Sequence, residues 1–264
     1  MTAIDVLGFI GALVIGLVLG LIGGGGSILT VPLLVYLLGY NPVVATAYSL
    51  FVVGASSVIG VIEKHQKKKV DFKTGLAFSF PSFLAVYISR RFLVPNIPDE
   101  IFTINQYVVT KEMVIMLFFA MVMLIAAASM IKNKATIAQP FVKQSYLKTF
   151  VQGLIIGTIT GIIGAGGGFL YVPALVLWAG LSMKNAVGTS LVIISINSII
   201  GFLGDLHVLT IDWAFLITFT ALTMAGVLLG GYLSKYVSNK KLKKSFGWFV
   251  LIMAIFIMVE EFSK

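Results

Sequence analysis

Residues 16–39 read GLVLGLIGGGGSILTVPLLVYLLG, and residues 157–180 read GTITGIIGAGGGFLYVPALVLWAG. A shift of 141 residues aligns the two stretches without a gap, and the match continues to Gly60 over Gly201. Apolar composition alone would align aliphatic residues, but it does not explain aligned glycines and prolines. These pairs are Gly16/Gly157, Gly20/Gly161, Gly23/Gly164, Gly25/Gly166, Gly26/Gly167 and Pro32/Pro173. The pattern predicts an internal duplication with five segments in each half.

The composition of the whole chain is typical of a membrane protein. Of its 264 residues 59% are hydrophobic and 11% are charged, whereas a soluble domain is about half apolar and a quarter charged. No charged side chain occurs from residue 6 to residue 62, and one bilayer crossing takes roughly 20 apolar residues. These numbers exclude an ordinary cytosolic protein. They also exclude a nucleic-acid-binding protein despite the net charge of +9, because the basic residues do not cover a soluble surface.

We therefore predict an all-α polytopic membrane protein. Its apolar segments lie at about 3–22, 27–39, 42–62, 73–92, 113–131, 147–164, 168–180, 184–204, 213–234 and 245–261. Segments 27–39 and 168–180 would be roughly 20 Å long as helices, which is shorter than a hydrocarbon core of about 30 Å. They are expected to be half-spanning pieces, re-entrant pieces or helices shielded by their neighbours.

The distribution of lysines predicts the orientation. Fourteen of the nineteen basic residues lie in the loops 63–73, 132–148 and 235–244, which the positive-inside rule places in the cytoplasm. Both termini are then exterior. The counterpart of the first loop, residues 204–212, has no lysine and two aspartates, so it is expected outside. Two equivalent loops on opposite sides of the membrane indicate that the repeats are inverted relative to each other. Repeat 1 is predicted at 1–131, a cytoplasmic linker at 132–148 and repeat 2 at 149–264. Inverted repeats with interrupted helices are typical of secondary transporters.

The glycine clusters GGGGS (23–27) and GAGGG (164–168) are expected to break a helix in each half. The helix that follows each break would begin with unpaired N–H groups and a partial positive charge, which together can hold an anion. Each proline would also leave a backbone carbonyl free. The alternative is a tight loop between packed helices. The predicted substrate-binding residues are Gly25, Gly26, Ser27, Thr30, Ser49, Gly166, Gly167, Gly168, Tyr171, Ser190 and Asn197.

No acid, histidine or basic residue lies at the centre of a segment, so a buried carboxylate relay for protons is not expected. A coupling ion, H⁺ or Na⁺, stays open. Arg90 and Arg91 fall at the predicted outer end of segment 73–92, where they would reach lipid headgroups or pair with Asp99 and Glu100. The sequence has no cysteine and no pattern of metal ligands, nucleophile and base, so we expect no metal, no cofactor and no enzyme activity.

The motif G-x-x-x-G-x-x-G-x-G-G-x-x-x-x-V-P in each half, with the stretch A-x-x-x-S-L at 45–50 and 186–191, resembles the TauE/SafE family, also called TSUP. The resemblance covers nearly the whole chain. It implies transport of small sulfur-containing anions, such as sulfite, thiosulfate or a sulfonate, across the bacterial inner membrane. The connection 93–112 departs from the repeat, since the second half has only a short lysine loop in its place.

The leading hypothesis is a secondary transporter that moves a small anion by alternating access. A passive anion channel of the same fold is the alternative. A membrane-embedded enzyme and a scaffold subunit are disfavoured, the second because paired broken helices would have no purpose there. The expected partners are a small anionic substrate and the lipid bilayer, with no nucleic acid. A homo-oligomer stays open.

Overall fold

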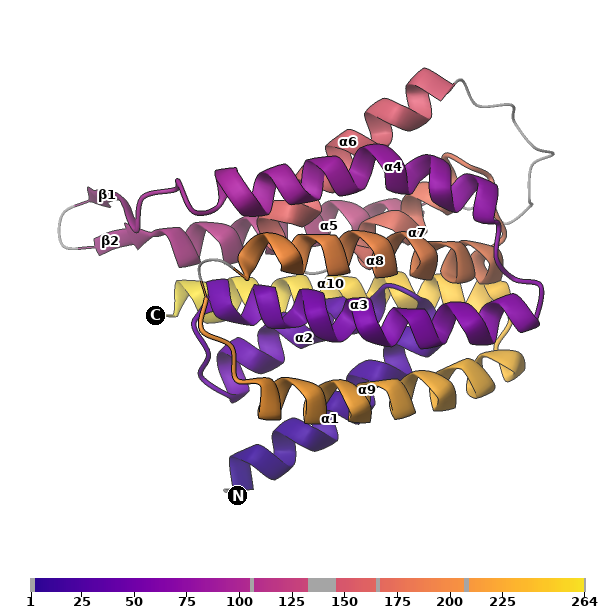
Figure 1. The fold of residues 1–264 in the computed structure, drawn as a ribbon, viewed down its shortest axis with the longest axis horizontal. Helices are drawn as coiled ribbons and strands as arrows, with labels where there is room; N and C mark the ends of the chain where they lie inside the picture. The colour runs from indigo at the N-terminus through magenta and orange to yellow at the C-terminus, as the bar shows by residue number, and fades with distance from the viewer. Residues whose placement is uncertain (1–2, 105–106, 133–145, 165–166, 207–208, 264) are drawn as a thin grey trace.

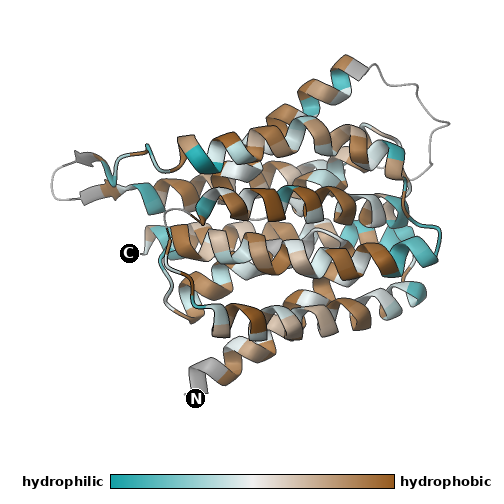
Figure 2. Ribbon diagram, in the orientation of Figure 1, coloured by the Kyte–Doolittle hydropathy of each residue, from teal (hydrophilic) through white to brown (hydrophobic). Residues whose placement is uncertain are grey.

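The computed structural model describes residues 3–104, 107–132, 146–164, 167–206 and 209–263. Within these ranges the chain is a bundle of α-helices (Figure 1). Hydrophilic residues gather toward the two ends of the bundle, and apolar residues cover the length between them (Figure 2). Large apolar side chains such as Ile125, Ile217 and Ile252 are more than half exposed. Such a belt fits contact with lipid, so the chain is an all-α, multi-pass membrane protein.

The helices lie close to the predicted segments. The first half contains α1 (Ala3–Ile22), α2 (Gly25–Pro32), the π-helical turn η1 (Leu33–Leu37), α3 (Pro42–Gln66), α4 (Phe72–Ile88), the π-helical turn η2 (Ser89–Leu93) and α5 (Lys111–Lys132). The second half contains α6 (Tyr146–Ile163), α7 (Gly168–Leu177), α8 (Met183–Asp205), α9 (Trp213–Leu233), the 3₁₀ turn η3 (Ser234–Tyr236) and α10 (Asn239–Phe262).

Local sequence explains where several helices start. The side chains of Asn41, Asp71, Ser182, Asp212 and Ser238 each accept a hydrogen bond from a backbone N–H in the first turn of the following helix. These residue types are preferred there because they satisfy donors that the helix itself cannot. The four helices α3, α5, α8 and α10, together with the stretch Trp213–Tyr236, are long and apolar enough to cross a membrane.

Two helices are short, as predicted. The α2 helix has 8 residues and continues into the 5 residues of η1, and α7 has 10 residues. At 1.5 Å per residue these lengths are roughly 20 Å and 15 Å, so neither helix alone spans a hydrocarbon core. In Figure 1, α2 runs back along the bundle in the direction opposite to α1.

The long connection after α4 contains a feature that the sequence analysis did not predict. Strands β1 (Glu100–Ile104) and β2 (Tyr107–Thr110) form an antiparallel hairpin that projects from one end of the bundle (Figure 1). The ammonium of Lys111 binds the carboxylate of Asp99 at 2.7 Å where the hairpin joins α5. The second half has no equivalent hairpin among the described residues, so the two halves differ at this end.

The lysine loops described by the structure lie at the opposite end. There α3 passes into α4, and α9 passes into α10, whereas α10 ends on the side of the hairpin (Figure 1). The loops 63–73 and 235–244 therefore lie on one side, as predicted. Most of the third loop, 132–148, lies outside the described residues. Which side faces the cytoplasm stays a prediction.

Helix contacts occur in matched pairs when α1–α5 are set against α6–α10. Thus α1 packs on α9 as α6 packs on α4, and α3 packs on α9 as α8 packs on α4. The pairs α2–α7, α3–α8 and α5–α10 are each made of counterparts. The predicted repeat requires such matches.

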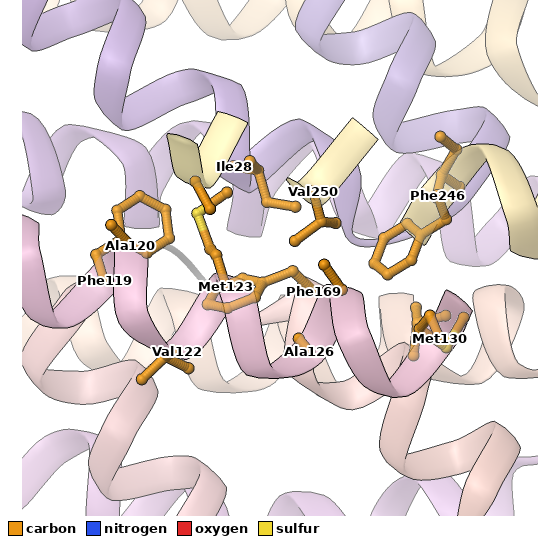
Figure 3. Close-up of a cluster of buried hydrophobic side chains, with 14 of the residues drawn as sticks. Ile28, Phe119, Ala120, Val122, Met123, Ala126, Met130, Phe169, Phe246 and Val250 are labelled. Atoms are coloured by element: carbon orange, nitrogen blue, oxygen red, sulfur yellow. The ribbon is translucent and has the colours of Figure 1, made fainter. Parts of the chain in front are cut away.

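The largest buried apolar cluster lies where the two short helices meet α5 and α10. Ile28 of α2 and Phe169 of α7 are fully buried there, together with Met123 of α5 and Val250 of α10 (Figure 3). Ile28 and Phe169 are 141 residues apart, so they are counterparts in the predicted repeat. This core holds the two glycine breaks against each other.

Candidate functional site

The two glycine breaks meet in space. Gly24 precedes α2 and Gly168 begins α7, and a Cβ added at Gly24 would overlap the carbonyl group of Gly168. A Cβ added at Gly168 would lie 2.5 Å from the Cα of Gly24. Only glycine permits this approach of two backbones. Because the contact joins the first residues of two helices, the partial positive charges of both N-termini converge on one region.

Each break also rests on a long helix of the other half. Gly23 and Gly164 both have positive φ, +79° and +71°, which ends α1 and α6 at a turn that favours glycine. A Cβ at Gly23 would lie 2.9 Å from Cα of Val187 on α8, and a Cβ at Gly164 would lie 2.9 Å from Oγ1 of Thr46 on α3. Val187 and Thr46 are themselves counterparts. These contacts place α8 against the first break and α3 against the second.

The predicted hydroxyl residues have different environments. Thr30 Oγ1 donates to the carbonyl of Gly26 at 2.8 Å, and Ser190 Oγ donates to the carbonyl of Val187 at 2.9 Å. Both bonds are within one helix, as is common for hydroxyls in membrane helices. Ser49, the counterpart of Ser190, is fully buried, and its Oγ has no hydrogen-bond partner among the described residues.

The remaining predicted glycine and serine residues belong to the helix starts. Gly25 begins α2, and Gly167 precedes α7 with φ +69°. Ser27 lies in the first turn of α2, although its side chain is outside the described part of the structure. Gly166 also lies outside the described residues. The structure thus brings Gly25, Gly167 and Gly168 together at one junction.

A buried polar cluster joins α7, α8 and α4 near this junction. The amide nitrogen Nδ2 of Asn197 donates to Oγ of Ser82 at 2.8 Å and to the hydroxyl oxygen of Tyr171 at 2.7 Å. The hydroxyls of Ser82 and Tyr171 are also hydrogen-bonded to each other. Tyr171 and Asn197 were predicted; Ser82 was missed. The repeat offers a signal for Ser82, because its counterpart Thr223 is also a buried hydroxyl residue.

A buried ion pair lies at the hairpin end of the bundle. The Nε of Arg90 is 2.9 and 2.8 Å from the two carboxylate oxygens of Asp205, and Nη2 is 2.5 Å from Oδ2. Nη1 also donates to Thr46 Oγ1 at 3.2 Å. Arg90 is fully buried, and a charge at such depth needs a partner with this geometry.

The prediction that Arg90 reaches lipid headgroups, Asp99 or Glu100 is therefore wrong. The turn η2 continues α4 and directs Arg90 inward, onto the last residue of α8, and Asp99 binds Lys111 instead. A usable signal was present in the sequence, since Arg90 and Asp205 end apolar segments on the same predicted side. A Cβ at Gly164 would lie 3.0 Å from Nη1 of Arg90, so the ion pair adjoins the second break.

Residues 8–257 match the family model described as sulfite exporter TauE/SafE. The chain belongs to the TauE/SafE family. The match includes both glycine breaks, the Arg90–Asp205 pair and the polar cluster around Asn197. No solved structure matches the chain significantly.

Curated relatives of this TauE/SafE chain are described as membrane transporters. A "Probable membrane transporter protein" from Xylella fastidiosa (strain 9a5c) is 29% identical over 95% of this chain and 93% of its own length. The "Probable membrane transporter protein YunE" of Bacillus subtilis (strain 168) is 29% identical over 96% of each chain. Family membership therefore places the chain among membrane transporters. Among the described residues, no three His, Asp or Glu side chains gather where they could hold a metal ion.

Proposed function

We propose that this chain moves a small sulfur-containing anion, such as sulfite, thiosulfate or a sulfonate, across the membrane by alternating access. The substrate would be held where α2 and α7 begin. The observation that carries the proposal is the contact between Gly24 and Gly168, which brings two helix N-termini together at glycine backbones. N–H groups and helix dipoles attract an anion strongly where surrounding helices exclude water.

A buried hydroxyl beside the junction supplies a further donor. Ser49 has a hydroxyl without a partner among the described residues, and it lies one turn after Thr46, which touches the second break. Tyr171 on α7 and Asn197 on α8 lie beside the first turn of α7, but their donors are bonded within the polar cluster with Ser82. The buried Arg90 beside the second break is paired with Asp205, so neutral donors and helix dipoles would bind the anion, and the bound anion could still leave.

The matched contacts of the two halves and the difference between the two ends support alternating access by an inverted repeat. Counterpart helices make matched contacts, and α1 and α6 run in opposite directions in Figure 1. The hairpin end contains the buried Arg90–Asp205 pair, whereas a pocket at the lysine end reaches Val187 beside Gly23. Rocking of the two halves about the glycine junction would open the hairpin end and close the lysine end.

The substrate class follows from the family description together with the site. The family is described as sulfite exporters, and the relatives are described only as membrane transporters. A backbone cradle made of glycine suits a compact anion, because no side chain separates the ligand from the N–H groups. The proposal therefore names the class and leaves the members of the class to experiment.

The test uses the purified chain in liposomes loaded with unlabelled sulfite, thiosulfate, a sulfonate, sulfate or a carboxylate. Uptake of the same anion, isotopically labelled, should be faster into loaded than into empty liposomes, because a carrier returns faster when occupied. Large unitary currents without this acceleration would favour the channel. Absence of uptake for every anion of the panel would contradict the proposed function.

A further inference from the structure

The lysine end of the bundle contains a pocket of about 80 Å³. Its polar lining comes from the end of α3 and the loop after it, the first turn of α8, and the turn η3 after α9. These residues are Lys64, Lys67, Lys69, Lys184, Ser234 and Lys235. The described lining thus contains five lysines and no acidic residue.

Several of these lysines are held in place by the fold. Lys64 is only 4% exposed, and its Nζ donates to Oγ of Ser234 at 2.8 Å. The backbone N–H of Lys69 donates to the carbonyl of Lys64 at 3.0 Å. A Cβ at Gly188 of α8 would overlap the carbonyl of Lys69, so the loop is packed against α8. A loop fixed on both sides presents its lysines at defined positions.

The positive charge at this pocket exceeds the negative charge that faces it. Glu63 is the acid paired here, and it lies 3.4 Å from the ammonium of Lys64 and also binds that of Lys67. Burial lowers the pKa of Lys67 below its usual value, and the charge of Lys235 lowers that pKa further. Crowded ammonium groups repel one another, and an anion bound among them would relieve that repulsion.

The pocket borders the first glycine break. Leu21, in the last turn of α1, and Val187, on α8, both line it. Gly23 follows Leu21 by two residues and rests on Val187. An anion in this pocket would therefore lie beside the turn that leads into α2. Two features of the pocket attract anions. They are the lysine side chains and the N-terminus of α8, where Lys184 lies.

We propose that this pocket is a loading site for a small, doubly charged oxyanion on its way to the glycine junction. The inference rests on the proposed function and adds a second binding site with a preference for charge. A cavity needs about 10–15 Å³ to hold one water molecule. The pocket volume of about 80 Å³ therefore has room for an oxyanion of a few heavy atoms. The pocket lysines would then have two roles. They would determine the orientation of the chain in the membrane, and they would concentrate the substrate near the glycine junction.

The test compares binding of thiosulfate to the purified full-length chain and two double variants by titration calorimetry at low salt. Lys69→Gln with Lys184→Gln removes two charges from the pocket. Lys240→Gln with Lys241→Gln removes two exposed charges from the start of α10 at the same end, outside the pocket lining. We expect the dissociation constant to rise by about tenfold or more in the first variant and by less than about twofold in the second.

Three outcomes would overturn the proposal. Equal binding by the pocket variant and the wild type, while the wild type still exchanges anions in liposomes, would remove the loading site and leave the proposed function intact. No binding and no exchange by the wild type would remove both. If the pocket lysines affect only the binding of phosphatidylglycerol, added to detergent or to nanodiscs of phosphatidylcholine, the pocket holds a lipid headgroup instead.

Discussion

Ser49 and Ser190 are matched serines on α3 and α8, but their hydroxyls differ in what they bind. Ser190 donates to the carbonyl of Val187, whereas Ser49 Oγ is buried without a partner among the described residues. The sequence alone presents the two serines as equal, because the repeat aligns them. It could not separate them, since the difference depends on side-chain orientation in the folded bundle. The Arg90–Asp205 pair differs, because the sequence does place both residues at segment ends on the same side, and only their contact depends on the fold.

The variant Ser49→Ala should weaken transport without weakening the fold. A buried hydroxyl with no partner costs free energy, so its removal should leave the melting temperature unchanged or higher. If the hydroxyl binds the substrate, the loss of one hydrogen bond should raise the KM for anion exchange about fivefold. Uptake kinetics in liposomes and thermal unfolding in detergent measure the two effects.

The matched control for this serine is Ser79→Ala. Ser79 is also buried, but its Oγ donates to the carbonyl of Gly75 within α4. This control should keep the wild-type KM. A wild-type KM in Ser49→Ala would remove Ser49 from the substrate site.

At the scale of helices, the positions of most elements could be predicted from hydrophobic runs and the glycine clusters. The α2 and α7 helices begin at Gly25 and Gly168, within the stretches of free N–H groups that the sequence predicted. The hairpin β1–β2 was not predicted, because a connection of mixed polarity carries no strong period. The glycines that the repeat aligns, Gly16 and Gly157, lie where two helices pack closely. Gly16 of α1 packs on Thr223 of α9, and Gly157 of α6 packs on Ser82 of α4.

Replacing either of these glycines by alanine should loosen a helix pair. A Cβ at Gly16 would overlap the carbonyl of Thr223, and a Cβ at Gly157 would lie 2.5 Å from the carbonyl oxygen of Ser82. Overpacking of this kind costs about 1–3 kcal/mol, so both variants should unfold at a lower temperature in detergent. Gly75→Ala is the control, because the nearest atom to its added Cβ is 3.4 Å away. If Gly16→Ala and Gly157→Ala melt like Gly75→Ala, the close packing is not needed for stability.

At the scale of the whole molecule, the two ends beside the glycine junction differ. The side that carries Arg90 and Asp205 contains a buried ion pair, and the side that carries Lys64 and Lys184 has a pocket. The sequence predicted the grouping of lysines at one end and a glycine break in each half. It could not predict that the lysines form a pocket, because they come from three separate parts of the chain. The orientation and the inverted repeat stay predictions.

The most direct test of the central claim is the exchange of labelled sulfite by Gly168→Ala in liposomes, beside Gly75→Ala and the wild type. The added methyl group would force the starts of α2 and α7 apart, since it would lie 2.5 Å from the Cα of Gly24. Size-exclusion chromatography would establish that equal amounts of folded protein are compared. We predict that Gly168→Ala loses exchange while Gly75→Ala keeps it. Wild-type exchange by Gly168→Ala would contradict the claim that the two glycine breaks together form the anion site.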